Sequence, residues 1–431
     1  MSDTFAKMCD KNTGYGRTGV YLYRDEIIYG FACTLYTVVQ MLSLMVWYTM
    51  SESPVPAMLV KYLRYVCYAL CMAAVLSKIR TRKFFGMACV LGFLLTVGAA
   101  YADNKNMLYI VLFVLAAYNV RSEWIIKFNF CIKTIMLFIT VIMSKFGLLL
   151  NYIFANRGAD RQGLGFAWTT YSPIMFFFIA LEYIYLRKGK MKLAEYFILE
   201  GINVWFYIMT NTTMTFALST LSIVLFAIGS NSKAAVRFTL KLKSLIISSP
   251  FIIAVFSVFI HASYKEESAF WVNLNEFLHD RLSLGFNGIR EYGITLWGQK
   301  IKWIGNGLYD RPDVKYNYVD CAYLQILLQY GVIVLVVALL LYSLILYKAY
   351  KAKEYGLIWI IVFSLLLCIT EPRLTVLIFN PFPMMAFGRF DGCAENAGDR
   401  ALARREVRIS WSYCRGWWSP RIPRKFTLKR L

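Results

Sequence analysis

Charged side chains are scarce in this sequence of 431 residues: they make up 17% of it, whereas an average soluble domain carries about a quarter. Hydrophobic residues reach 59% and aromatic residues 17%. A water-soluble core cannot bury that much apolar surface, and a disordered chain would be far more polar. The composition therefore excludes a soluble enzyme, a nucleic-acid-binding module and a disordered protein, and it favours a chain that lies in a lipid bilayer.

Familiar catalytic motifs and metal-binding spacings are missing as well. The chain has no P-loop, no HExxH and no GxSxG segment, and the missing P-loop argues against an ATP-driven pump. Its ten cysteines show no paired spacing, which excludes a disulfide framework and a zinc site. Only two histidines are present, His261 and His279. We therefore expect no metal and no other cofactor.

What the sequence does contain is a series of apolar runs, most of them about twenty residues long, which is the length a helix needs to cross a bilayer. We predict an all-α, polytopic integral membrane protein with about twelve transmembrane helices. The expected spans are 27–50, 59–77, 84–101, 107–120, 128–150, 166–186, 193–210, 213–229, 244–262, 321–347, 356–370 and 374–388.

Basic residues indicate how these spans are oriented. The formal net charge is +22, and the lysines and arginines gather in every second short loop between the expected spans. Such a bias is typical of cytoplasmic loops, and it explains the charge without a nucleic-acid partner. We predict a multi-pass protein with both termini in the cytoplasm and no bound nucleic acid.

Two of the expected outer segments are longer than simple loops, residues 151–166 and residues 263–320. The second is the one large extracytoplasmic loop that we predict. Apolar residues at helical spacing within it predict an amphipathic helix over 268–282, which would lie on the outer membrane surface or pack in a small external cap.

The composition changes near the C-terminus. We assign residues 1–388 to one membrane domain and residues 389–431 to a basic tail with nine arginines and two lysines. A tail that touches anionic lipid is one interpretation of this charge. A C-terminus that is not native to the fold, such as one from a shifted reading frame, is the other.

Arginines in the shorter outer segment suit a phosphorylated ligand. Arg157 and Arg161 are four residues apart, so that on a helix they would share one face. Paired guanidinium groups fit a phosphate or pyrophosphate because each can bond two oxygens, and the neighbouring glycines would let the backbone approach a bulky ligand. Contact with lipid headgroups is the alternative explanation.

Several acid–base candidates lie in or after the large loop. His279 could act as a base near neutral pH, or it could be a solvated loop histidine. Asp320 opens the tenth expected span, where an acid either caps the helix N-terminus or takes part in catalysis. Glu371 and Arg373 interrupt the last apolar stretch, where we expect them to pair with each other.

The segment that ends the large loop, Tyr318 to Gly331, reads YVDCAYLQILLQYG. Together with residues 157–166 and 371–382 and the order of the spans, it resembles Wzy-type polymerases of O-antigen and capsular polysaccharide repeat units. The resemblance covers roughly residues 1–388, and the tail has no counterpart in that family.

The resemblance implies an inverting, metal-independent glycosyl transfer at the outer face of the bacterial cytoplasmic (inner) membrane. The donor would be the growing glycan on undecaprenyl diphosphate, and the acceptor another undecaprenyl-diphosphate-linked oligosaccharide. A chain-length regulator and a flippase would be partners. The same resemblance implies diphosphate contacts for Arg157, Arg161, Arg281 and Arg290, and a catalytic base at Asp320 or His279.

Two other functions stay open at this point. A ligase that joins finished glycan to a lipid or protein acceptor would have the same general plan. A transporter or flippase of lipid-linked oligosaccharide would place charged residues around a midplane cavity and show a repeat of its two halves. We find no repeat between residues 27–200 and 213–388, and the large outer loop favours an enzyme.

Overall fold

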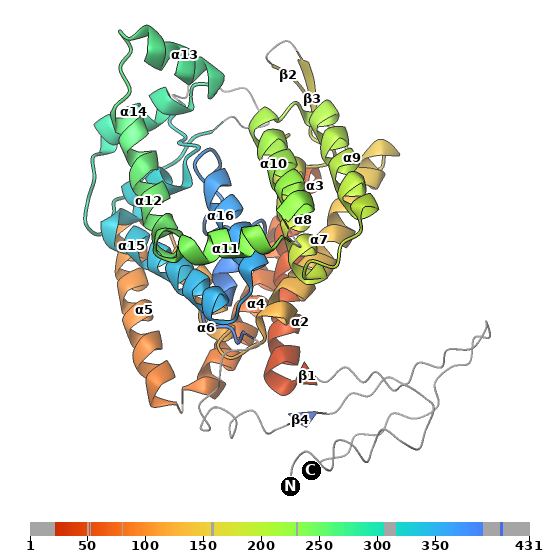
Figure 1. The fold of residues 1–431 in the computed structure, drawn as a ribbon, viewed down its shortest axis with the longest axis vertical. Coiled ribbons are helices and arrows are strands. Elements are labelled where there is room, and N and C mark those ends of the chain that lie inside the picture. The colour runs from red at the N-terminus through yellow and green to blue at the C-terminus, as the bar shows by residue number, and fades with distance from the viewer. Residues whose placement is uncertain are drawn as a thin grey trace, which may run out of the picture. The chain divides into compact units, whose positions relative to one another are not determined.

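The computed structural model describes residues 22–49, 51, 53–79, 81–156, 159–229, 232–305, 316–390 and 406–407. Within these residues it contains fifteen α-helices and two short antiparallel sheets (Figure 1), so the chain is mostly helical, as predicted. The elements in chain order are β1 (Leu22–Tyr23), α2 (Arg24–Leu44), α3 (Val46–Thr49), α4 (Val55–Lys78), α5 (Arg82–Tyr101), α6 (Asn106–Ala116), α7 (Ser122–Lys145), β2 (Ile153–Asn156), β3 (Ala159–Gln162), α8 (Tyr171–Arg187), α9 (Leu193–Thr210), α10 (Thr213–Gly229), α11 (Lys233–Lys241), α12 (Lys243–Ala262), α13 (Ala269–Phe277), α14 (Arg281–Tyr292), α15 (Ala322–Lys351), α16 (Tyr355–Leu367), the 3-10 helix η1 (Phe382–Met385) and β4 (Glu406–Val407).

Six helices in the described part of the chain are long and apolar enough to cross a membrane: α2 from Glu26 onward, α4, α5, α7, α12 and α15. A seventh span results if α10 and α11 are counted as one bent span. The expected spans at 107–120, 166–186, 193–210, 213–229 and 356–370 coincide with helices of only 11 to 18 residues. The structure therefore supports a membrane protein with six or seven spans by this measure, and the count of about twelve is not confirmed.

The last expected span, residues 374–388, is not an α-helix as predicted. These residues form an irregular segment with only one short turn of helix, η1, although most of their side chains are buried. Proline explains the difference, because Pro372, Pro381 and Pro383 remove backbone donors and cannot continue an α-helix. We call residues 374–390 the buried segment.

Side chains replace the helical hydrogen bonds that the buried segment lacks. The Tyr342 hydroxyl donates to the Leu374 carbonyl at 2.7 Å and accepts from the Asn380 amide at 2.8 Å. The Lys348 ammonium donates to the Gly388 carbonyl at 2.6 Å. Irregular backbone is tolerated at membrane depth only where other protein groups satisfy it, and these bonds meet that condition.

An ion pair inside the helix bundle holds the middle of the buried segment. Lys133 of α7 and Glu182 of α8 pair with each other, and both side chains are fully buried. The Lys133 ammonium also donates to the Phe379 carbonyl at 3.0 Å. The pair therefore links two packed helices to the irregular segment.

Replacing Lys133 by methionine is expected to lower the free energy of unfolding by about 3–5 kcal/mol, because it leaves the Glu182 charge buried alone and the Phe379 carbonyl without its donor. Thermal unfolding of the purified protein in detergent measures the loss. The matched control is Lys127→Met, an exposed lysine on the same helix. Adding Glu182→Leu to Lys133→Met should restore much of the stability, and a Lys133→Met protein as stable as the control would contradict this role.

Helix α15 is broken near its middle at Gly331, which has φ 84° and ψ 175°. Residues 293–299 of the large loop enter the break. The Val332 amide donates to the Thr295 carbonyl at 3.0 Å, and the Gln299 amide donates to the Gln329 carbonyl at 2.9 Å. A Cβ atom at Gly331 would lie 2.4 Å from the Gly298 amide nitrogen, so only glycine fits both the space and the positive φ.

The large loop contains two helices where we predicted one over 268–282. Helix α13 ends at Phe277 and α14 begins at Arg281, because His279 and Asp280 take left-handed conformations with φ 56° and 65°. The side chain of Asn275 stabilises the break. Its Oδ1 accepts from the backbone amide of Ser283 at 2.9 Å, and its Nδ2 donates to the Asp280 carboxylate at 3.1 Å. Helix α14 then packs on α12 and α15, so this part of the loop belongs to the helix bundle.

The chain divides into two compact units, one of residues 29–393 and one of residues 1–28 with 394–431. In the second unit β1 pairs with β4, and Leu22 lies opposite Val407. The two interpretations of the tail 389–431 concern residues that, apart from 389–390 and 406–407, lie outside the described part of the chain.

Candidate functional site

The shorter of the two predicted outer segments, residues 151–166, contains a hairpin and not a helix. Strands β2 and β3 pair antiparallel, with Phe154 opposite Arg161. The helical arrangement considered for Arg157 and Arg161 is therefore wrong, and Arg157 itself lies outside the described residues. Arg161 is only 8% exposed, and its Nε donates to the Thr210 carbonyl at 2.9 Å. That carbonyl belongs to the last turn of α9, where helix carbonyls lack helical partners.

Arg281 connects the large loop to acids from two other segments. It is the first residue of α14, and its Nη2 lies 3.1 Å from Oε1 of Glu371, which follows α16. Its Nε lies 3.6 Å from Oδ2 of Asp320, which precedes α15. The N-cap residue of α15 is Cys321, and its side chain makes no capping bond. The carboxylate of Asp320 thus lies in an ion pair with the arginine that we had predicted for the ligand.

Glu371 is the centre of this site. It is 3% exposed, and burial raises the pKa of its carboxyl to about 7. Arg281 lowers this pKa, Asp320 raises it, and Arg373 and Arg161 lower it further. All four groups therefore lie near enough to act on Glu371. We call Arg161, Arg281, Asp320, Glu371 and Arg373 the arginine–carboxylate cluster.

Arg373 does not pair with Glu371 as expected, since Glu371 pairs with Arg281. Its guanidinium carbon lies 4.6 Å from the centre of the Phe379 ring and 5.4 Å from that of Tyr171. Its Nε is buried and has no hydrogen-bond partner among the described residues. A buried donor without a partner is costly, so this nitrogen is a candidate to bind a ligand.

One predicted site residue, Arg290, lies apart from the cluster. Arg290 is exposed and nine residues after Arg281 on α14, which places it about 180° around the helix. It lines a separate cavity with Tyr316 and Asn317. His279 lies half-buried in the turn before α14, two residues before Arg281, in a left-handed conformation with φ 56°.

The sequence contained a signal for Glu371 and Arg373 that we had interpreted too simply. Ionisable residues inside an apolar stretch are costly, and they are functional candidates for that reason. Their sequence proximity suggested a mutual ion pair, whereas the fold brings Arg281 from ninety positions away. In the described part of the chain, no group of three or more histidine, cysteine, aspartate or glutamate side chains could hold a metal ion.

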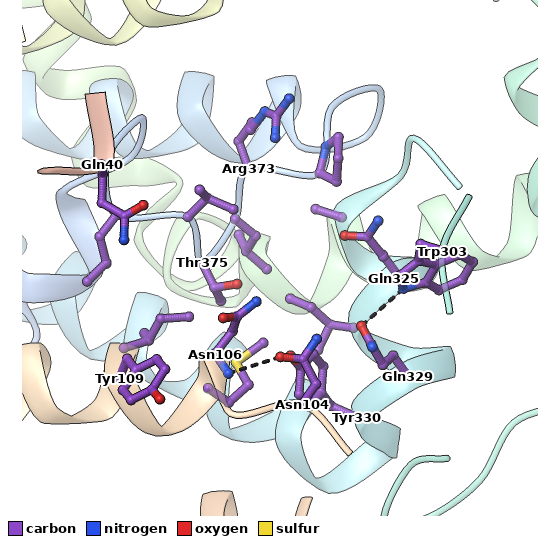
Figure 2. Close-up of a pocket in the computed structure, with 18 of the residues that line it drawn as sticks. Gln40, Asn104, Asn106, Tyr109, Trp303, Gln325, Gln329, Tyr330, Arg373 and Thr375 are labelled. Carbon is purple, nitrogen blue, oxygen red and sulfur yellow. Dashed lines mark hydrogen bonds between the residues drawn. The ribbon is translucent and has the colours of Figure 1, made fainter. Parts of the chain in front are cut away.

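Next to the cluster lies a cavity of about 320 Å³ (Figure 2). Its walls come from α2, α4, α6 and α15, from Trp303 and from residues 372–377, and Arg373 is part of them. The described site thus combines a cluster of opposite charges with an adjoining polar cavity. No family model, no curated protein and no solved structure matches this chain.

Proposed function

We propose that this protein is a membrane glycosyltransferase that polymerises lipid-linked repeat units of a polysaccharide. It transfers the growing glycan from undecaprenyl diphosphate to the next undecaprenyl-diphosphate-linked oligosaccharide. The single observation that carries the proposal is the meeting of Arg161, Arg281 and Arg373, from three separate segments, around the buried carboxyl of Glu371. The resemblance of residues 318–331 to Wzy-type polymerases supports the same reaction.

The cluster suits departure of a lipid diphosphate. As the bond between the anomeric carbon and the diphosphate oxygen breaks, negative charge grows on that oxygen. Guanidinium groups held in place by the fold stabilise such charge without reorganising. Arg161 and Arg281 are already fixed by the Thr210 carbonyl and by the two acids. The diphosphate competes with these acids for Arg281 and meets the unpartnered Nε of Arg373.

Glu371 is our proposed general base. The acceptor hydroxyl attacks the anomeric carbon and gives its proton to the Glu371 carboxylate, with inversion at that carbon. A base whose pKa lies close to the working pH is both available in the ionised form and strong enough to take the proton, and the pKa of Glu371 is raised to about 7. In this proposal Glu371 takes the role that the resemblance gave to Asp320 or His279, and Asp320 keeps Arg281 in place.

The proposed orientation has the cluster outside and both termini in the cytoplasm of a bacterial inner membrane. The predicted inner loops contact one another, which supports this arrangement. The Lys78 ammonium donates to the Tyr118 carbonyl at 2.8 Å, and Lys188 pairs with Glu123. The arginines of the cluster come from the two predicted outer segments and from the turn after α16.

Cysteine labelling tests the orientation. Glu266→Cys, in the exposed start of the large loop, should react with a membrane-impermeant maleimide added to spheroplasts. Lys190→Cys, exposed between α8 and α9, should react only after lysis, because we place it in the cytoplasm. Both variants are made in a chain without its native cysteines. The reverse labelling pattern would exclude an outer active site.

The reaction itself is tested with purified protein and one undecaprenyl-diphosphate-linked repeat unit as the sole substrate. Products that grow by whole repeat units are expected, with release of undecaprenyl diphosphate. A ligase would leave the substrate unchanged until a different acceptor is added. A flippase would move the substrate across a vesicle membrane and form no new glycosidic bond.

A further inference from the structure

Uncharged polar and aromatic side chains make up more than half of the lining of the cavity beside the cluster, and most of the others are apolar. Of the described residues that line it, Arg373 is the one with a charge. The lining includes five amide side chains, five tyrosines and Trp303. Amides in a membrane protein are costly unless something satisfies them. The cavity is therefore suited to a ligand that is neutral and rich in hydrogen-bonding groups.

Some of these polar groups build the wall. Gln329 accepts from the Trp303 indole at 3.0 Å and donates to the Ile301 carbonyl at 3.3 Å, which fixes the indole in the wall (Figure 2). The Asn104 side chain accepts from the Asn106 amide of the backbone at 3.0 Å and so begins α6. These two amides are occupied by the fold.

Other groups are left for a ligand. Among the described residues, the side chains of Asn106 and Thr375 make no hydrogen bond. That of Gln325 bonds the Tyr318 side chain and makes a long bond of 3.5 Å to the Val319 carbonyl, so its amide is only partly used. They come from α6, α15 and the 372–377 stretch, and Figure 2 shows all three among the side chains that line the cavity. An amide both donates and accepts, as a sugar hydroxyl does.

The aromatic side chains add flat surfaces. Tyr68 and Tyr109 stack with ring centres 4.0 Å apart and an angle of 5° between the rings, and both line the cavity. Trp303 packs edge-on against Tyr318 with ring centres 6.3 Å apart, and both also line the cavity. Aromatic faces beside amide groups match the alternation of C–H faces and hydroxyl edges in a pyranose ring.

The cavity adjoins the cluster through two residues. Arg373 belongs to both. Tyr318 lines the cavity; burial raises its pKa, Arg373 and a hydrogen bond with the Gln325 side chain lower it, and Asp320 raises it, so its phenol lies within reach of both charges. A ring seated in the cavity would thus lie beside Arg373, which belongs to the cluster.

We infer that this cavity binds an uncharged sugar of the acceptor repeat unit and holds it beside the arginine–carboxylate cluster. The inference rests on the proposed function. It assigns the choice of acceptor sugar to Asn106, Gln325 and Thr375, whereas the arginines recognise the diphosphate whatever sugar it carries.

The test measures binding apart from catalysis. The lipid-free repeat-unit oligosaccharide is titrated into detergent-solubilised protein, and binding is followed by calorimetry. Asn106→Leu and Gln325→Leu should each weaken binding about tenfold, because each leaves sugar hydroxyls without a partner. Thr375→Val, which keeps the shape of the side chain, should weaken it less. The control Asn273→Leu, on the exposed side of α13, should bind like the natural protein.

The outcomes separate the two proposals. Arg281→Ala should bind the free oligosaccharide normally while failing to extend glycans. If the natural protein polymerises repeat units but Asn106→Leu, Gln325→Leu and Thr375→Val bind and polymerise as it does, the cavity assignment is wrong and the proposed function stands. If the oligosaccharide binds and these variants weaken it, but no polymer forms, the cavity assignment holds and the polymerase proposal is wrong.

Discussion

Arg281→Ala is expected to lower the rate of glycan extension about 10²–10³-fold while the protein is still inserted and folded. The guanidinium of Arg281 reaches Glu371 at 3.1 Å and Asp320 at 3.6 Å, so it is the cation that joins the two acids to the proposed site of the diphosphate. Its loss removes charge stabilisation from the leaving group and leaves two acids facing each other. The measurement is the rate of repeat-unit addition by purified protein at saturating substrate.

Arg290→Ala is the matched control, because Arg290 lies on the same helix, is exposed and points about 180° away from Arg281. It should extend glycans at nearly the natural rate. Arg161→Ala should resemble Arg281→Ala and leave single repeat units on the lipid. If the Arg281 and Arg290 variants were equally active, the proposal that the cluster stabilises the diphosphate would be wrong.

Glu371→Gln is expected to reduce the rate by about 10²–10⁴-fold, because glutamine keeps the shape of the side chain but cannot accept the proton. In the natural protein the rate should rise with pH and level off above about pH 7. This follows because the folded-state pKa of Glu371 is raised to about 7 and only the ionised form is a base. The residual rate of Glu371→Gln should show no such rise.

Asp320→Asn tests which of the two acids, Asp320 or Glu371, is the base. Asp320 raises the pKa of Glu371, so removing its charge should move the midpoint of the pH profile to lower pH while keeping its form. If Asp320 were the base, its replacement would abolish the rise and Glu371→Gln would keep it. The pH profiles of the two variants, measured with the same lipid-linked substrate, decide between them.

The long apolar runs predicted the helices well because hydrophobicity over about twenty residues is a local property. Six expected spans, such as 128–150, which overlaps α7 (Ser122–Lys145), correspond to helices long enough to cross a membrane. The helix that we predicted at 374–388 does not form, although these residues are apolar too. These residues are apolar because they are buried in protein, and Tyr342, Lys348 and Lys133 satisfy their backbone from elsewhere in the chain.

The candidate site was only partly accessible from the sequence. Arg161, Arg281 and Asp320 could be selected from charge and position, and the structure brings all three within reach of Glu371. Their partners could not be predicted, since nothing local to Arg281 indicates an acid ninety positions later. The left-handed turn at His279 and Asp280 likewise depends on Asn275, whose side chain closes the turn across the end of α13.

The break in α15 has a consequence for biogenesis. Because the Val332 and Gln299 amides bond to carbonyls across the break, α15 reaches its final form only after residues 293–299 have arrived beside it. Under the proposed orientation those residues must first be translocated, so the helix inserted after them is completed later than the ones before it. A membrane-inserted chain that is truncated shortly after residue 331 and released from the ribosome should therefore still expose the 263–320 segment to protease on the far side of the membrane, and the full-length chain should protect it.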